Sequence, residues 1–116
     1  MAISKTAAVF RKEGKTLDIT PVAKINCGDI KVVNGLNCIA LWDIAAGEAG
    51  TLKVLHRGEV VEITTDDAIG ATDAGTAIYV VPATGLVTKT ATNNTLLGYA
   101  RAAIGATDKA FEIVCA

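Results

Sequence analysis

Short apolar runs separated by turn residues constrain the fold of this chain most strongly. The runs are rich in Val, Ile and Leu, span five to eight residues, and are separated by clusters of Gly, Asn, Asp and Thr. They cover residues 29–33, 38–44, 51–57, 59–65, 77–81, 86–91, 95–102 and 110–116, with an earlier piece at 16–20. This spacing leaves little room for helix. It predicts an all-β protein, either a compact antiparallel β-sandwich or a small β-barrel with short hairpins.

The connections carry turn chemistry at the expected places. In "VVPATGLV", Pro82 fixes φ at one turn position and Gly85 can supply a positive φ at another, so residues 77–91 are predicted to form a β-hairpin. The hexapeptide AIGATD occurs at 68–73 and at 103–108, and we interpret each copy as a turn. The stronger internal likeness joins two segments with the same plan, residues 38–55 and 96–114.

Length and charge predict one domain with an N-terminal arm. A chain of 116 residues suits a single core. Four cations and one anion give residues 1–15 a net charge of +3, which leaves -4 for the remainder of a chain whose total is -1. We therefore predict an arm at residues 1–15 and a single β domain at residues 16–116, with a solvated strand as the alternative interpretation of the arm.

Residues suited to chemistry are few. The three cysteines have neither CxxC nor CxxH spacing, so they are predicted to be small buried hydrophobes and not disulfide or zinc residues; they are Cys27, Cys38 and Cys115. The only histidine, His56, lies in the run 51–57 and is interpreted as a strand residue and not as a metal ligand or a catalytic base. Asp66 and Asp67 are adjacent, so on an extended chain they point apart and are predicted to lie in a solvated loop. No catalytic, cofactor-binding or metal-binding residue is predicted, and we expect no enzyme activity and no cofactor.

The large aromatic side chains could serve the core or a partner. Trp42 and Tyr79 are the candidates, and the core is the favoured location for both. No stretch has the eighteen or so consecutive apolar residues of a membrane helix, and the first residues lack the apolar segment of a signal peptide. The small net charge argues against nucleic acid. We expect a soluble protein made in a cytoplasm, with neither membrane nor nucleic acid as its partner.

The order of motifs resembles a known family. The segments "AVFRKEGKTLDITP", "CGDIKVV", "IALWDIAAGEAGTLKV" and "GTAIYVVPATGLVTKTATNNTLLGYA", followed by a short closing strand, resemble the tailed-phage capsid cement or head decoration proteins over nearly the whole chain. The resemblance implies a compact β-rich protein that binds the outside of an assembled capsid, with the major capsid protein as partner. It also implies a symmetric homo-oligomer, a trimer in preference to a dimer, and no enzymatic activity or cofactor.

On this hypothesis the arm contacts the capsid or a neighbouring subunit. The expected contact residues are Lys5, Phe10, Arg11, Lys12 and Lys15, with Phe10 as the apolar anchor. Two alternatives stay open. One is another virion structural component, such as a capsid or tail accessory protein, and the other is a small β-sandwich module that binds a sugar or peptide ligand.

Overall fold

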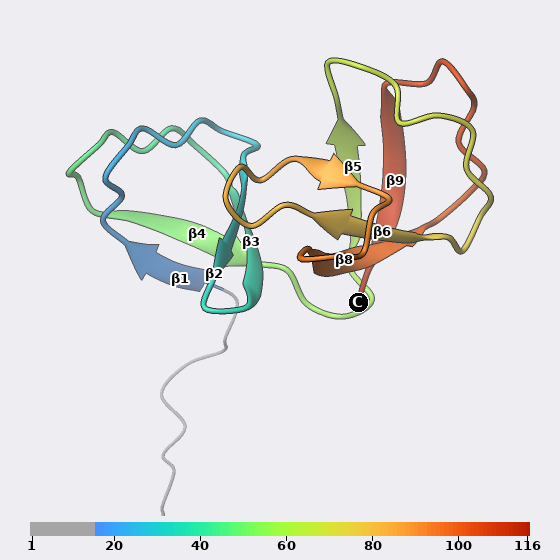
Figure 1. The fold of residues 1–116 in the computed structure, drawn as a ribbon. Coiled ribbons are helices and arrows are strands. Elements are labelled where there is room, and N and C mark those ends of the chain that lie inside the picture. The colour runs from blue at the N-terminus through green and yellow to red at the C-terminus, as the bar shows by residue number, and fades with distance from the viewer. Residues whose placement is uncertain (1–15) are drawn as a thin grey trace, which may run out of the picture.

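Nine β-strands and no helix make up the part of the chain that the computed structural model describes, residues 16–116 (Figure 1). No segment within this range is a helix that could span a membrane. The strands are β1 (Thr16–Ile19), β2 (Ile30–Val33), β3 (Leu36–Ala40), β4 (Gly50–Val54), β5 (Val60–Thr64), β6 (Ala77–Val80), β7 (Val87–Thr88), β8 (Thr95–Ala100) and β9 (Ala110–Cys115). The all-β prediction is confirmed.

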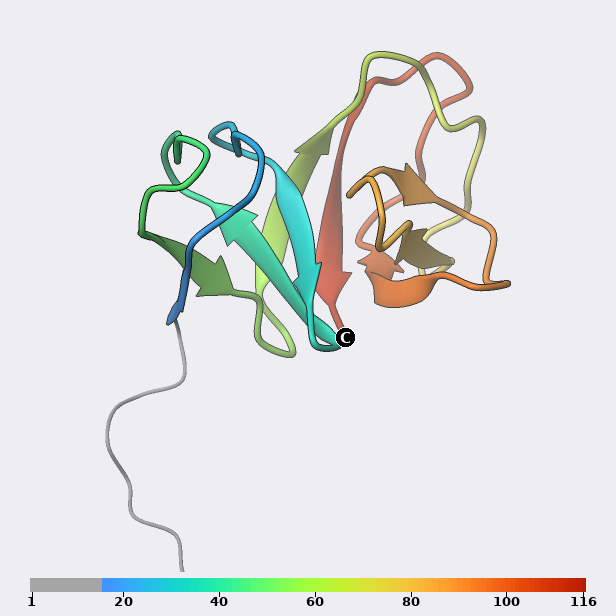
Figure 2. The same ribbon diagram turned by 60° about the vertical axis from the view of Figure 1, so that its left-hand side comes forward.

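The strands form two antiparallel sheets that pack as a sandwich (Figures 1 and 2). The N-terminal sheet has the order β1-β4-β3-β2, and the C-terminal sheet has the order β5-β9-β8-β6-β7. The linker from β4 to β5, residues 55–59, connects them. Figure 2 shows the N-terminal sheet, coloured blue to green, beside the C-terminal sheet, coloured yellow-green to red.

Left-handed turn residues create the tight hairpins. Asn34 and Gly35 have φ of 50° and 81° and join β2 to β3, as a two-residue type I′ loop requires. The predicted hairpin at 77–91 is confirmed, because β6 pairs with β7 through Val80 and Val87. Its turn residue Gly85 has φ of 73°, and a Cβ there would overlap the backbone carbonyl of Ile30. Only glycine allows this turn to approach β2 so closely.

Two hydrophobic cores result from the alternation of side chains along the strands. The smaller core lies under the loops of the N-terminal sheet and is formed by Ile25, Cys38, Ala40, Ile44, Leu52 and Val54. The larger core fills the inner face of the C-terminal sheet, and Ile30 of β2 and Leu55 of the linker are buried in it. Val32 and Ile39 also pack against this larger core from the N-terminal sheet. The two sheets therefore share one apolar interior along β2 and β3.

The N-terminal sheet and the first four strands of the C-terminal sheet have the same topology. β1, β4, β3 and β2 correspond in order to β5, β9, β8 and β6, while residues 81–94, which include β7, are an addition. Equivalent backbone bonds support the correspondence: Gly28 N donates to Ala40 O at 2.7 Å, and Gly75 N donates to Ala100 O at 2.8 Å. The likeness between segments 38–55 and 96–114 is thus part of a likeness between two whole sheets.

The turn interpretation of AIGATD is correct for the second copy, where Asp108 N donates to Gly105 O at 3.2 Å, but wrong for the first copy, whose residues 68–73 precede a turn at residues 74–75. Ile104 of the second copy forms an isolated bridge with Thr72 of the first copy, and the corresponding bridge of the N-terminal sheet joins Ile25 to Ile44. Ile104 is the second residue of its hexapeptide and Thr72 is the fifth. Because this bridge is antiparallel, the pairing of the second residue with the fifth means that the two copies run in opposite directions with no offset between them.

Candidate interaction surfaces

The predicted contact residues of the arm fall outside the part of the chain that is described. Lys5, Phe10, Arg11, Lys12 and Lys15 all precede Thr16. The surfaces that can be assigned within residues 16–116 are a pair of loops on the N-terminal sheet, the outer face of the C-terminal sheet, the linker between the sheets, and a cleft beside β5.

Two loops of the N-terminal sheet, residues 20–28 and 41–49, are bonded to each other along their length. Ile25 and Ile44 exchange both backbone hydrogen bonds at 2.9 and 2.8 Å. Cys27 N donates to Asp43 Oδ1 at 2.8 Å, and at the other end Gly47 N donates to Pro21 O at 2.8 Å. We call this pair of segments the N-terminal loop pair. Its backbone bonds hold its outer side chains on a fixed scaffold.

The N-terminal loop pair exposes large apolar side chains. Val22 is 100% exposed, Leu41 is 48% exposed and Trp42 is 55% exposed. The prediction that Trp42 belongs to the core is therefore wrong. The run 38–44 was expected to be one strand, but β3 ends at Ala40 because the chain then turns into the loop pair. Tyr79, on β6, is half-buried.

The equivalent loops of the C-terminal sheet provide an internal comparison. Ala40 and Ala100 accept the equivalent backbone bonds, so Leu41 and Trp42 correspond to Arg101 and Ala102. The same backbone position thus carries tryptophan in one sheet and alanine in the other. Because the fold is compatible with alanine there, packing within the chain does not require the indole of Trp42.

The outer face of the C-terminal sheet carries an apolar row across four strands. Val60 pairs with Val114, Val114 with Tyr99, and Tyr99 with Ala77. Val60 and Tyr99 are 47% and 43% exposed. The next row contains Glu62 opposite Glu112, and Arg101 forms an ion pair with Glu112 at 2.9 Å. This face is therefore an apolar strip with a charged border.

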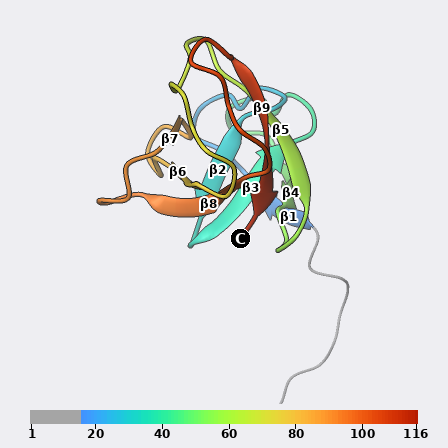
Figure 3. The same ribbon diagram turned by 90° about the vertical axis from the view of Figure 1, so that its right-hand side faces the viewer.

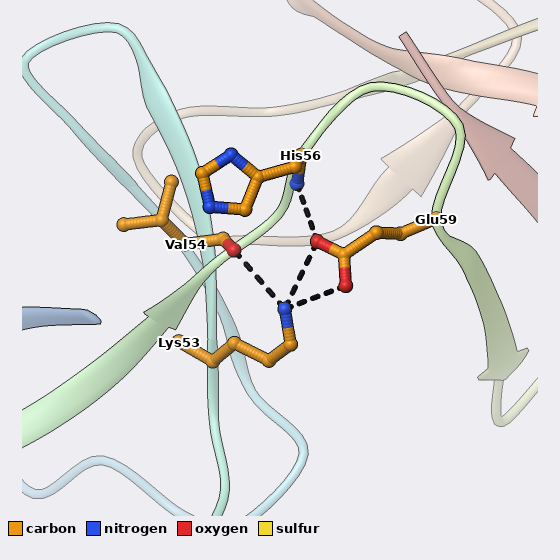
Figure 4. A network of polar contacts seen from close by, with 4 residues as sticks. All are labelled: Lys53, Val54, His56 and Glu59. Carbon is orange, nitrogen blue, oxygen red and sulfur yellow. Dashed lines mark hydrogen bonds and ion pairs between the residues drawn. The ribbon is translucent and has the colours of Figure 1, made fainter. Parts of the chain in front are cut away.

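The linker between the sheets is fixed by one ion pair (Figure 4). Lys53 Nζ lies 2.7 Å from Glu59 Oε2 and 2.9 Å from Oε1, and His56 N donates to Glu59 Oε1 at 2.7 Å. The hydrogen bond from Lys53, and then that from His56 N, hold the pKa of Glu59 below its ordinary value of 4.5. The pair connects the last residues of β4 to the residue before β5 and stabilises the linker conformation.

The other candidate chemical residues are mostly as predicted. Asp66 and Asp67 are exposed in a bend after β5, and Cys38 and Cys115 are buried. Burial raises the pKa of both buried thiols. Cys27 is exposed, so the prediction of burial is wrong for this residue; it lies in the N-terminal loop pair, where its thiol donates to Leu41 O at 3.2 Å. Residues 16–116 bring together no group of three or more His, Cys, Asp or Glu side chains that could hold a metal ion.

His56 follows β4 and does not belong to it. The strand ends at Val54, Leu55 is buried in the larger core, and His56 begins the turn of the linker. Its ring Nε2 is buried and has no hydrogen-bond partner within residues 16–116. Its backbone N–H, which binds Glu59, has a structural role that the sequence did not reveal.

A cleft of about 700 Å³ lies beside β5. Residues 61–69, from β5 and the bend after it, form one wall, and residues 84–90, around β7, form the opposite wall. Residues 28–31 and Ile39 of the N-terminal sheet close its base. The cleft is therefore lined by both edge strands of the C-terminal sheet and by β2, an edge strand of the N-terminal sheet. In the view of Figure 3, β2 lies between β7 and β5.

These features define a small β-sandwich protein whose distinctive residues are on exposed loops, edges and faces. The family model described as phage cement protein matches residues 11–115, and the chain belongs to this family. It is accordingly a structural protein of the virion that stabilises the phage capsid, in a family that is not a class of enzymes. No curated protein and no solved structure matches the chain.

Proposed function

We propose that this cement protein binds the outer surface of the assembled capsid through its N-terminal loop pair, with the major capsid protein as its partner. The proposal rests on the residues at two equivalent backbone positions. The N-terminal sheet has an exposed tryptophan there, Trp42, and the C-terminal sheet has an alanine, Ala102. An exposed indole that the fold does not need is typical of a binding hot spot, where aromatic residues are enriched. Val22 and Leu41 extend this apolar character along the same loop pair.

Binding of this kind stabilises a shell without any catalytic group. A protein that binds the assembled shell and not its dissociated subunits stabilises the shell by mass action. We propose that the chain acts as a symmetric homo-oligomer, a trimer in preference to a dimer, because several equivalent weak contacts then add through avidity. The chain would be made in the host cytoplasm and located on the capsid exterior.

We also propose that residues 16–116 act as a single domain. The buried contacts of Ile30 and Leu55 in the core of the C-terminal sheet support this organisation, as does the Lys53–Glu59 ion pair in the linker. A single rigid body would keep the loop pair at a fixed orientation to the rest of the molecule.

The arm remains a proposed contact region. Its residues Lys5, Phe10, Arg11, Lys12 and Lys15 would contact the shell or a neighbouring subunit. The strand pairings and cores described here lie within residues 16–116, so deletion of residues 1–15 is expected to leave the domain folded and to abolish capsid binding. A truncated chain that binds capsids as well as the full chain would contradict the role of the arm.

The experiment that tests the proposed surface is Trp42→Ala in the full chain. This change gives the N-terminal sheet the residue that its counterpart already has at Ala102. We expect unchanged folding and a loss of capsid affinity of about thirtyfold or more, in the range of hot-spot aromatics. Leu36→Ala is the matched control, because Leu36 is also exposed, at 46%, but lies at the start of β3, at the opposite end of that strand from the loop pair. Equal binding by both variants would refute the loop pair as the contact surface.

The alternative of a ligand-binding module gains no support. Such a module would present Trp42 and Tyr79 together on one concave face. They instead occupy different sheets, with Trp42 in the loop after β3 and Tyr79 half-buried on β6.

A further inference from the structure

The walls of the cleft beside β5 are strand edges and not strand faces. Residues 61–65 and residues 84–90 line it consecutively. Because successive side chains of a strand point to opposite faces, a face would contribute only alternate residues. Lining by consecutive residues means that the backbone of each edge strand borders the cleft. Unpaired strand edges of this kind are templates for a further strand.

The register of β5 shows which of its backbone groups border the cleft. Thr65 N donates to Lys109 O at 2.8 Å, on the side of β9. Peptide groups of an antiparallel strand alternate between its two neighbours, so those of Glu62 and Thr64 point away from β9. No other backbone group within residues 16–116 bonds to Glu62 or Thr64 on that side.

The opposite wall has the same property. Val81 N donates to Leu86 O at 2.9 Å, and Val80 is the register partner of Val87, so the peptide groups of Val87 point away from β6. Between these two walls lies β2, with the apolar side chain of Ile30 buried beneath. The cleft thus offers an apolar base and two free hydrogen-bonding edges, which are the elements that bind an extended peptide by strand addition.

The charges around the cleft select a basic peptide. Its lining contains four carboxylates and two ammonium groups, for a net charge of -2; they are Asp29, Glu62, Asp66 and Asp67, with Lys31 and Lys89. One of the two cations already has a partner within the chain, because Lys89 Nζ donates a hydrogen bond to Ala71 O at 3.4 Å. The arm, residues 1–15, has the complementary net charge of +3 and includes the short apolar segment "AAVF" at 7–10.

We propose that the cleft binds the arm of a neighbouring copy of this chain as an added β-strand. This inference rests on the homo-oligomer proposed above and names the site through which the copies associate. β5 has five residues, so a strand of about five residues, about 17 Å long, would pair along it. The basic residues that follow the apolar segment, Arg11 and Lys12, would meet the carboxylates at the rim.

A neighbouring copy suits this role better than the chain's own arm. Thr16, Lys53, Ile39 and Ile30 form one row of register partners straight across the N-terminal sheet. The arm therefore ends at the edge opposite to the cleft, about 14 Å away over three strand spacings. The direct path along that row is occupied, since Lys53 binds Glu59 of the linker and Ile30 and Ile39 pack against the larger core.

Point substitutions in the full chain test the proposal by sedimentation equilibrium. Thr64→Pro removes an N–H that points into the cleft and leaves the hydrogen bonds between β5 and β9 intact. Asp18→Pro is the matched control, because its N–H points outward from the other exposed edge, β1, and its side chain loses only an exposed bond with Thr51. We expect the wild type and Asp18→Pro to self-associate, and Thr64→Pro to have a self-dissociation constant raised about tenfold or more.

Charge reversal gives a second test that does not depend on proline. Reversing two charges of the arm, by Arg11→Glu with Lys12→Glu, should weaken self-association. Reversing two charges of the cleft, by Glu62→Lys with Asp66→Lys, should weaken it as well. All four substitutions together should restore it, because the attraction is re-established with opposite signs. Glu62→Lys also removes a like-charge pair with Glu112, so the fold does not suffer.

The proposal would be overturned if the wild type is monomeric. It would also be overturned if Thr64→Pro and Asp18→Pro self-associate equally, or if the four charge reversals together do not restore self-association. Capsid binding is scored separately on the same variants. If the protein binds capsids but the cleft variants self-associate as strongly as the wild type, this inference is refuted and the proposed function is not. Cleft-dependent self-association without capsid binding would refute the proposed function alone.

Discussion

Ile30→Ala tests whether the two sheets are one folding unit. Ile30 belongs to the N-terminal sheet but is 7% exposed within the core of the C-terminal sheet. The substitution removes three buried carbons, about 2.4 kcal/mol of transfer free energy, and leaves a cavity that adds to this cost. We expect the free energy of unfolding to fall by about 3–4 kcal/mol. This is a large share of the roughly 5–15 kcal/mol that stabilises a typical small domain.

Urea unfolding followed by two probes measures this effect. The chain has a single tryptophan, Trp42, so its fluorescence reports on the N-terminal sheet, while far-ultraviolet circular dichroism reports on the strands of both sheets. For one cooperative unit the two transitions coincide and shift together in Ile30→Ala. The control Val22→Ala, at a fully exposed position, should change the free energy by less than about 0.5 kcal/mol. Separate transitions for the two probes, or a loss below about 1 kcal/mol in Ile30→Ala, would refute the shared core.

Three further predictions concern single contacts. The depressed pKa of Glu59 means that its ion pair contributes stability above the ordinary value of 4.5 and that this contribution is lost as the pH falls. Glu59→Gln should therefore flatten the decline of unfolding free energy between roughly pH 5 and 3, and an unchanged slope would contradict this assignment. A Cβ on Gly98 would overlap the Val114 carbonyl. Gly98→Ala should therefore lower the free energy of unfolding, measured in urea, by about 1–3 kcal/mol. An unchanged free energy would show that β8 and β9 can separate freely. One of three thiols, that of Cys27, should react with a thiol reagent in the folded protein, and rapid reaction of Cys38 or Cys115 would contradict their burial.

The sequence predicts those parts of the fold that depend on near neighbours. The hairpin at 77–91 is predictable because Pro82 and Gly85 determine its turn locally, and Gly85 has the expected positive φ. Exposed Glu62 and Glu112 follow from the alternation of apolar and polar residues along β5 and β9. The all-β class follows from many such short signals.

The parts that could not be predicted depend on pairing between distant residues. The run at 38–44 is apolar to its end, and only the bridge between Ile44 and Ile25 shows that the chain has left β3 and that Trp42 is exposed. The antiparallel alignment of the two AIGATD copies also arises from a distant pairing, Thr72 with Ile104. Similarly, the cleft beside β5 exists because two edges far apart in sequence face each other. Comparison of the two sheets by topology, and not by literal sequence, identifies Trp42 as the residue to test.

The most direct test of the central claim is cryo-microscopy of matching capsids mixed with the full chain and, separately, with Trp42→Ala. We expect ordered density on the outer surface of the shell at symmetry-related positions, with the N-terminal loop pair facing the shell. We also expect Trp42→Ala to occupy far fewer of these positions at the same concentration. Equal occupancy by the two proteins, or bound protein whose loop pair points away from the shell, would contradict the proposed mode of binding.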